Sequence, residues 1–256
     1  MPKQKSVLSV FGRTQPIIGL IHLKGENDED VFTRAKNEIE LYLENGIDAV
    51  LVENYYGHYY HMETVLDYLR NEKKNVVFGV NCLNLDALGF ELAAKYGAKF
   101  VQFDSVVGHV KPRDDYSLDA FFKLYRERYD VFVLGGVRFK YQPVLSIRSV
   151  EEDLRIACSR CDAIVVTQDA TGQETSLDKI KEFRQAIGDF PLFVGAGVTP
   201  TNCDQQLRLV DGAIIGSYFK DTYKDSGEVC KEHVTEIVDA FNLHRKEGKY
   251  DSTSEG

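Results

Sequence analysis

The stretch Pro191-Leu-Phe-Val-Gly-Ala-Gly-Val-Thr199 combines a short apolar run with a Gly-x-Gly turn. A fully apolar run of this length is typical of a parallel strand covered on both faces. The segment Gly212-Ala-Ile-Ile-Gly-Ser217 repeats this arrangement further along the chain. Two apolar strands that each end in glycine, with a helix-sized segment between them, predict a strand–helix–strand unit of an α/β fold.

The same alternation extends back to the start of the chain, which has 256 residues, the usual size of one (β/α)₈ barrel. We predict a single TIM barrel over residues 1–246 and a polar tail over 247–256. The predicted strands are 16–23, 48–54, 76–81, 99–104, 131–140, 162–167, 191–195 and 212–215. The predicted helices are 30–45, 63–71, 85–96, 118–129, 150–159, 177–187, 200–209 and 228–245.

Small residues recur in these strands with a half-chain period. Gly19 and Gly135 are about 116 residues apart, as are Gly79 and Gly195. Alanines near the starts of the even strands repeat at a similar spacing. A self-similar pattern of this kind predicts a duplicated half-barrel, in which small residues let side chains from alternate strands stack inside the barrel.

Composition and charge exclude several classes of function. The formal net charge of −9 argues against a nucleic-acid-binding protein, which needs a basic face. The apolar runs are too short to span a bilayer, and Met1–Lys5 does not resemble a secretory signal, so we expect a cytoplasmic protein. Cys158 and Cys161 have C-x-x-C spacing, but without a second such pair we expect buried, reduced thiols. A homo-oligomer stays open.

Polar residues end nearly every predicted strand. Loops at the C-terminal ends of barrel strands carry the active site in this fold, so these residues are candidates for function. The candidates for catalysis are His22, Glu53, Asp104 and Lys140. The candidates for substrate binding are Asn54, Asn81, Arg138, Thr167, Thr171 and Gly172.

The loops after the last two strands predict a phosphate site. Glycines let backbone amides approach an anion closely, and the expected helix starts at Pro200 and Tyr218 would add positive dipole ends. The predicted phosphate-binding residues are Gly195, Gly197, Val198, Gly216 and Ser217. Asn81 and Gln102 occupy the corresponding positions of the first half-barrel, so we expect one phosphate site rather than two.

Glu53 and Lys140 allow two interpretations each. Glu53 ends an apolar strand, where burial would raise its pKa and suit acid–base catalysis, or it is tied into a salt bridge. Lys140 aligns with Lys24 through the repeat. It could form a Schiff base, but we favour an electrostatic role toward a substrate phosphate or carboxylate.

The segment Asn54-Tyr-Tyr-Gly-His-Tyr-Tyr-His61 is rich in aromatic residues. His58 and His61 could bind a metal together with Glu53. We prefer a lid, a surface that stacks on a ring, or a subunit contact, and we predict no metal or cofactor.

Several of these motifs, in this order and spacing, are also found in one known family. The chain resembles the BtpA/SgcQ family across nearly its whole length. The segments that carry the resemblance are Ile18-Gly-Leu-Ile-His-Leu23, Val52-Glu-Asn54, Gly79-Val-Asn-Cys-Leu-Asn-Leu-Asp86, Asp162-Ala-Ile-Val-Val-Thr167, Ala170-Thr-Gly172, Val194-Gly-Ala-Gly-Val-Thr199 and Asp211-Gly-Ala-Ile-Ile-Gly216.

The resemblance implies a ribulose-phosphate-binding-like barrel. Some members are linked to photosystem I biogenesis, and others are placed with sugar-utilisation genes as candidate enzymes. It also implies a polar mouth that includes His22, Glu53, Asn54, Asn81, Lys140, Thr167, Gly172, Gly197 and Gly216. This chain departs from the family pattern at Lys24–Asp30, at Asn84 where an arginine is usual, and at Gln102–Asp104 where Arg-x-Asn is usual.

Two functional hypotheses follow. The first is an enzyme that acts on a small phosphorylated sugar or nucleotide-like substrate by isomerisation, a lyase step or glycosidic cleavage. The second is a non-catalytic assembly factor that uses a surface patch, such as the tyrosine-rich loop, rather than the barrel mouth.

Overall fold

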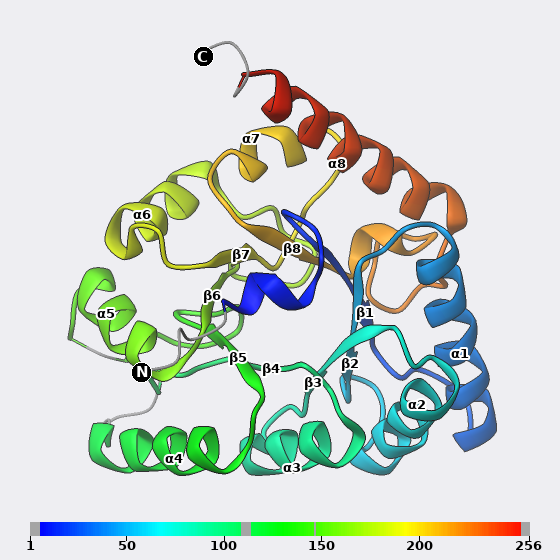
Figure 1. Ribbon diagram of the computed structural model, residues 1–256, viewed down its shortest axis with the longest axis horizontal. Coiled ribbons are helices and arrows are strands. Elements are labelled where there is room, and N and C mark those ends of the chain that lie inside the picture. The colour runs from blue at the N-terminus through cyan, green and yellow to red at the C-terminus, as the bar shows by residue number, and fades with distance from the viewer. Residues whose placement is uncertain (1–5, 109–113, 146, 252–256) are drawn as a thin grey trace.

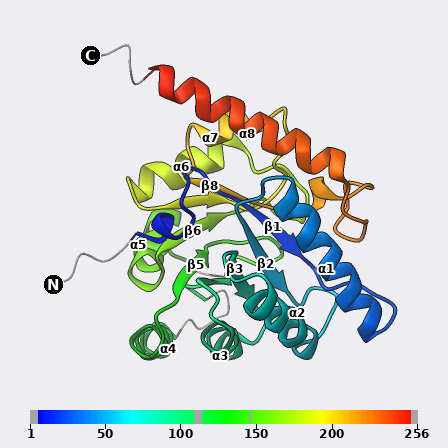
Figure 2. The same cartoon turned by 45° about the vertical axis from the view of Figure 1, so that its right-hand side comes forward.

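A computed structural model of the protein describes residues 6–108, 114–145 and 147–251. Within these residues, eight parallel strands close into a barrel in sequence order, and the last strand pairs with the first. Helices surround the barrel as an outer layer, as Figure 1 shows and as Figure 2 shows after a 45° turn. The (β/α)₈ barrel predicted from the sequence is confirmed.

Each strand falls inside its predicted range. The strands are β1 (Ile17–Ile21), β2 (Ala49–Glu53), β3 (Val77–Asn81), β4 (Phe100–Phe103), β5 (Phe132–Gly136), β6 (Ala163–Val166), β7 (Leu192–Val194) and β8 (Gly212–Ile215). The α-helices are α1 (Asp28–Glu44), α2 (Tyr59–Glu72), α3 (Asp86–Tyr96), α4 (Asp115–Arg128), α5 (Val150–Arg160), α6 (Leu177–Ile187), α7 (Cys203–Leu207) and α8 (Lys231–Asp251). Two 3₁₀-helices, η1 (Val7–Val10) and η2 (Ser217–Phe219), complete the described elements.

Alternation along the strands divides the apolar core in two. Successive side chains of a strand point to opposite faces of the sheet. Ile17 and Ile21 of β1 therefore belong to the layer between barrel and helices, whereas Ile18 and Leu20 belong to the cluster inside the barrel. Side chains, not solvent, fill the centre of the barrel.

The first described residues close one end of the barrel. The Phe11 ring lies 5.7 Å from the Phe100 ring and 6.0 Å from the Phe193 ring, measured between centroids. Both partners lie near the N-terminal ends of their strands, and Val7 of η1 is 1% exposed. In Figure 1 this dark-blue segment crosses the barrel opening. The sequence did not predict this plug.

The four landmark glycines fall into two pairs with different surroundings. A Cβ atom at Gly19 would lie 2.7 Å from Tyr42 of α1, and one at Gly135 would lie 2.7 Å from Val106. A Cβ at Gly79 would instead meet Phe100 inside the barrel, and one at Gly195 would meet Val165 there. Only the second pair makes room inside the barrel, so our interior-packing account of the first pair was wrong.

Several element boundaries differ from prediction, and α2 begins at Tyr59 instead of residue 63, so the last three residues of the tyrosine-rich segment lie in this helix. Strand β5 ends at Gly136 because Arg138 adopts a left-handed φ of 47°, so Arg138 and Lys140 belong to the following loop. Helix α7 begins at Cys203 rather than Pro200, because Asn202 Oδ1 accepts from the Thr199 amide and Asn202 Nδ2 donates to the Gly197 carbonyl. Helix α8 continues to Asp251, into the expected tail, whose residues 252–256 lie outside the described residues.

Two smaller points complete the fold. In the part of the chain that the structure describes, none of the helices combines the length and the apolar character that crossing a membrane requires. Cys158 and Cys161 are free thiols and the second is buried. Burial raises the pKa of Cys158 to about 11 and holds that of Cys161 well above its usual value.

Candidate active site at the C-terminal mouth of the barrel

The inward-facing side chains become polar at the C-terminal ends of the strands. Glu53 and Asn81 end their strands, and His22 and Thr167 directly follow theirs. Gln102 faces inward from β4 because it lies two residues after the inward-facing Phe100. These five side chains are between 0% and 5% exposed. Since buried polar groups are costly without partners, a polar layer here indicates a binding site rather than packing.

Glu53 supplies the carboxyl group of this layer, and the pKa of that group is strongly shifted. Its Oε2 atom accepts a hydrogen bond of 2.7 Å from Asn81 Nδ2, and the same amide lies 3.5 Å from Asp104 Oδ1. Burial raises the pKa of Glu53 to about 7, opposed by the charge of Lys140 and assisted by that of Asp104. A carboxyl group that titrates near neutral pH can both accept and donate a proton.

His22 is a neutral imidazole. Burial, together with the charges of Lys220 and Lys140, lowers its pKa to about 3. Its Nδ1 atom is buried and has no hydrogen-bond partner among the described residues. The Tyr55 ring packs 5.3 Å away between centroids and covers the imidazole from the β2–α2 loop. His22 can therefore exchange a hydrogen bond with a ligand, but it does not supply positive charge.

Lys220 is a second cation beneath the mouth. It is 2% exposed and forms an ion pair with Glu38 of α1. Burial raises the pKa of Glu38, and the charge of Lys220 opposes that shift. The pair has a structural role, because it joins the β8–α8 connection to α1. The charge of Lys220 also lowers the pKa of His22.

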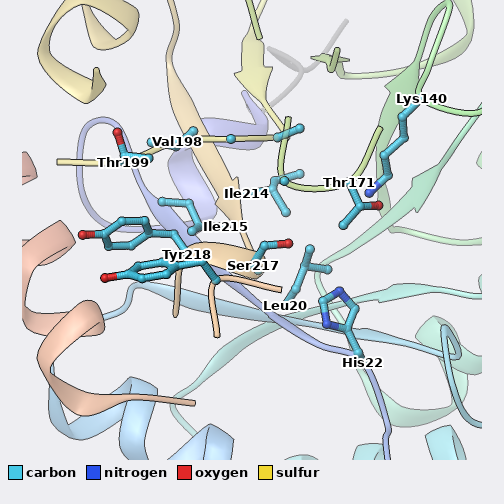
Figure 3. Close-up of a pocket in the computed structure, with 16 residues that line it drawn as sticks. Leu20, His22, Lys140, Thr171, Val198, Thr199, Ile214, Ile215, Ser217 and Tyr218 are labelled. Atoms are coloured by element: carbon cyan, nitrogen blue, oxygen red, sulfur yellow. The ribbon is translucent and has the colours of Figure 1, made fainter. Parts of the chain in front are cut away.

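A cavity of about 230 Å³ opens between the loops after β7 and β8. Gly195–Thr199 line one wall, Gly216–Tyr218 line another, and Gly172 and Thr171 contribute from the loop after β6. Lys140 and His22 line the side nearer the barrel centre, as Figure 3 shows. The two glycine loops therefore converge on one space, together with one ammonium group.

Close packing explains why glycine occupies these loops. Gly197 has a left-handed φ of 63°, and a Cβ there would lie 2.3 Å from the backbone of Glu174. A Cβ at Gly216 would lie 3.0 Å from Cε1 of His22. Two amides of the first loop are already engaged, since Gly195 N donates to the Val166 carbonyl and Thr199 N to Asn202. Gly195 thus contributes through its small size.

Because α7 is short and starts late, it does not supply the positive potential that the sequence predicted for the phosphate site. A five-residue helix that begins at Cys203 does not present its N-terminus at Gly197, so the dipole contribution expected from Pro200 onward is not supported. A short helix does follow β8, since the 3₁₀-helix η2 begins at Ser217, one residue before the expected Tyr218.

Arg138 and Asn54 lie outside the cavity. The Arg138 Nε atom bonds Asp153 Oδ2 at 3.2 Å, and its Nη2 atom bonds the Arg148 carbonyl at 2.7 Å. Arg138 therefore braces the β5–α5 loop against α5, so the geometry gives no support for a substrate contact. Asn54 Oδ1 accepts from the Leu83 amide at 2.7 Å and ties two loops together. Thr167 Oγ1 accepts from the Lys140 amide and so positions that lysine.

A second cavity, of about 190 Å³, adjoins the layer on the side of β3 and β4. Its lining residues include Asn81, Asp104 and Asp86. Burial raises the pKa of Asp86 to about 6, and the charge of Asp104 adds to the shift. The mouth therefore has a glycine-rich end and an acidic end.

The tyrosine- and histidine-rich loop has a structural component. His61 Nδ1 accepts from the His58 amide at the start of α2, and His61 Nε2 lies 2.9 Å from Asp28 Oδ1. These contacts occupy both ring nitrogens of His61. No group of three or more metal-binding side chains occurs in the described ranges. Tyr56, Tyr59 and Tyr60 are 45%, 49% and 43% exposed.

The sequence analysis did not select four residues near the mouth as site candidates: Gln102, Asp86, Tyr218 and Tyr223. Gln102 had a signal, since an amide two residues after Phe100 in an apolar strand must share its inward face. Asp86, Tyr218 and Tyr223 had none, because their positions depend on how separate loops pack.

Comparison with known sequences decides the family. A sequence model of the BtpA family matches residues 13–243. The chain belongs to the BtpA family.

The relatives match most of the length of this chain. An uncharacterized protein of Pyrococcus horikoshii is 30% identical over 253 residues, which cover 88% of this chain and 95% of the relative. The photosystem I biogenesis protein BtpA of Synechocystis is 25% identical over 240 residues, which cover 84% of this chain and 83% of the relative. The expected BtpA resemblance is confirmed.

Solved structures support the same fold for this BtpA-family chain. The native KDPGal structure has a TM-score of 0.64 at 14% identity and covers 90% of this chain and 96% of its own. Thiamine phosphate pyrophosphorylase from Pyrococcus furiosus has a TM-score of 0.60 at 14% identity, with the same two coverages. At this identity, the likeness shows the TIM-barrel fold alone.

Proposed function

We propose that this BtpA-family protein is an enzyme that acts on a small phosphorylated sugar or nucleotide-like molecule. The observation that carries the proposal is the convergence of the Gly195–Thr199 and Gly216–Ser217 loops on one cavity that also contains Lys140 and His22. Barrels of this class commonly bind phosphate at this position, and one of the structural neighbours is named for a phosphate-containing compound.

The phosphate would sit between the two loops. Amides of Gly197, Val198, Gly216 and Ser217 would donate to its oxygens, and the Lys140 ammonium would balance part of its charge. Gly172 and Thr171 would complete the wall. Binding energy from this remote group would then hold the reacting carbons over the polar layer.

Glu53 would transfer the proton. Its pKa of about 7 lets it act as a base or an acid near neutral pH. Asn81 orients the carboxylate, Lys140 stabilises its ionised form, and neutral His22 would hydrogen-bond a developing oxyanion or hydroxyl. Asp104, beside Asn81, would contact the polar end of the substrate. This arrangement serves an isomerisation, a lyase step or a glycosidic cleavage alike, since each needs one transferred proton and one stabilised charge.

Thermal denaturation with inorganic phosphate and a panel of sugar phosphates tests the proposal. Binding to the folded state raises the melting temperature in proportion to the logarithm of ligand concentration. We expect a rise for the wild type and none for Gly197→Asp, which places a carboxylate in the loop. If the wild type shows no rise with any of these ligands, the proposed phosphate site is refuted.

The exposed tyrosines of the β2–α2 loop and of the first turn of α2 support a second candidate, an assembly factor, which the name of the Synechocystis relative suggests. This alternative predicts that loss of Tyr56, Tyr59 and Tyr60 abolishes function, whereas loss of Glu53 and Lys140 does not. Complementation of a deletion strain with these two variants separates the candidates.

A further inference from the structure

The candidate phosphate cavity continues past its glycine loops to a pair of aromatic rings. Tyr218 and Tyr223, which we call the aromatic ledge, line the cavity beside Val198 and Thr199. In Figure 3, Tyr218 lies on the opposite side of the cavity from Lys140 and His22. Ser217, one of the proposed phosphate contacts, directly precedes Tyr218. The phosphate position therefore lies between the barrel centre and the ledge.

Helix α8 holds the ledge in place. The Tyr223 ring stacks on His233 with centroids 4.4 Å apart and an interplanar angle of 17°. The Tyr218 ring packs 5.4 Å from Tyr223, and its hydroxyl donates to Glu236 at 2.7 Å. Both rings are thus supported from behind by side chains of α8, so they are pre-organised before any ligand arrives.

Tyr223 keeps an open side. It is 55% exposed, and its backbone has a left-handed φ of 56°, which is strained for a residue other than glycine. A strained backbone that presents a stacked yet exposed ring at the edge of a cavity indicates a function for that ring. Its first face is occupied by His233, so the other face is left for a planar group.

The chemistry of this end of the cavity favours a ring over a sugar. Among the described residues that line the cavity, Lys140 is the one with a charged side chain, and it lies at the far end. The ledge end contains Val198, Ile215 and the two tyrosine rings, with the Thr199 hydroxyl at its rim. Aromatic faces bind heteroaromatic rings by stacking. Sugar hydroxyls need hydrogen-bonding partners, and the side chains at this end of the cavity offer few of them.

We infer that the ligand carries a nucleobase-like heteroaromatic ring on the outer side of its phosphate, stacked on Tyr223. This inference rests on the proposed phosphate site and narrows it to nucleotides and to sugars linked to a nucleoside through a diphosphate. Such a ligand lays its phosphate on the glycine loops and its ring on the ledge, while any group on the inner side faces Glu53.

Calorimetric titration with AMP and ribose 5-phosphate tests the inference, because the two probes share the ribose phosphate and differ at C1′, where AMP carries adenine and ribose 5-phosphate a hydroxyl. We expect the wild type to bind AMP about tenfold more tightly than ribose 5-phosphate, a gain typical of one stacked base. Tyr223→Ala should remove that gain and leave ribose 5-phosphate binding within about twofold of the wild type. Tyr223→Phe should retain it, because the ring is preserved.

Tyr116→Ala is the matched control, since Tyr116 is 85% exposed on α4 and outside the cavity. Equal wild-type affinities for the two probes, or a Tyr223→Ala variant that weakens both equally, would overturn the inference and leave the phosphate site intact. If neither inorganic phosphate nor ribose 5-phosphate binds the wild type, the proposed function fails and the inference fails with it.

Discussion

Asn81 Nδ2 donates a hydrogen bond of 2.7 Å to Glu53 Oε2, and the two residues are paired in the register of β2 and β3. The bond favours the ionised carboxylate, whereas burial favours the neutral acid. Burial is the larger effect, so the pKa of Glu53 rises to about 7. Parallel pairing of two strand ends thereby brings a proton-transfer group and the amide that orients it into contact.

The raised pKa of Glu53 makes the free energy of unfolding depend on pH. Because the folded-state pKa exceeds that of the unfolded chain, the stabilisation is complete below about pH 4 and is lost as the pH rises through 7. At pH 8.5, Glu53→Gln should be more stable than the wild type by about 1–3 kcal/mol, and near pH 4.5 the two should be equal. Urea denaturation at both pH values measures this. A constant difference between the two proteins would contradict it.

Gly197 and Gly188 offer a matched pair of substitutions to alanine. Both glycines have left-handed φ angles, 63° and 59°, but a Cβ at Gly188 meets nothing within 4 Å, whereas one at Gly197 meets the Glu174 backbone. Gly188→Ala should cost about 1–3 kcal/mol from backbone strain alone, because few residues other than glycine adopt its φ of 59° with its ψ of −127°. Gly197→Ala should cost about 2–4 kcal/mol and also abolish the phosphate-dependent rise in melting temperature. Equal losses, with phosphate binding intact in both, would count against the packing account.

Arg138 and Lys140 are two residues apart but should have different roles, Arg138 in stability and Lys140 in phosphate binding. Arg138→Ala removes contacts to Asp153 and to the Arg148 carbonyl, so it should destabilise the fold by about 1–3 kcal/mol without changing the affinity for phosphate. Lys140→Ala should weaken phosphate binding about tenfold or more and change stability by less than about 0.5 kcal/mol. Denaturation and calorimetry on the two variants test both halves, and a loss of phosphate affinity in Arg138→Ala would restore the original prediction.

The Lys220–Glu38 pair is buried, so breaking it from one side should be costly. Lys220→Met leaves the Glu38 carboxylate without its main cation and should reduce the free energy of unfolding by about 3–5 kcal/mol. Adding Glu38→Gln should recover much of that loss. The pKa of His22, now about 3, should rise in Lys220→Met because a nearby positive charge is gone, which proton NMR of the histidine can follow. A double variant no more stable than the single one would refute the account.

The sequence predicted the barrel well because strand periodicity is local information. All eight strands fall within their predicted ranges, since apolar runs and their flanking glycines are visible without an alignment. The predicted boundaries were wrong where a single residue determines where an element begins or ends. The left-handed φ of Arg138 ends β5 early, and the Asn202 bonds to Gly197 and Thr199 delay α7. Neither effect has a signature in hydrophobic periodicity.

Candidate site residues were predictable to the extent that they sit on strands. Glu53, Asn81 and Thr167 follow from their positions at strand ends, and the structure places all three in the inward-facing layer. Arg138 occupies an equally plausible position in the sequence, but its guanidinium donates a hydrogen bond to Asp153 of α5. Tyr223 lies in a loop whose path is fixed by α8 through His233, a contact between residues that no spacing rule connects.

The plug formed by Val7 and Phe11 closes the end of the barrel that lies away from the polar layer. In the part of the chain that the structure describes, the polar layer therefore opens toward the loops that follow the strands. Any compound that reacts in the polar layer must leave by the path that brought it in. Product and reactant would then be unable to occupy the polar layer together, and steady-state kinetics would show product inhibition competitive with the reactant.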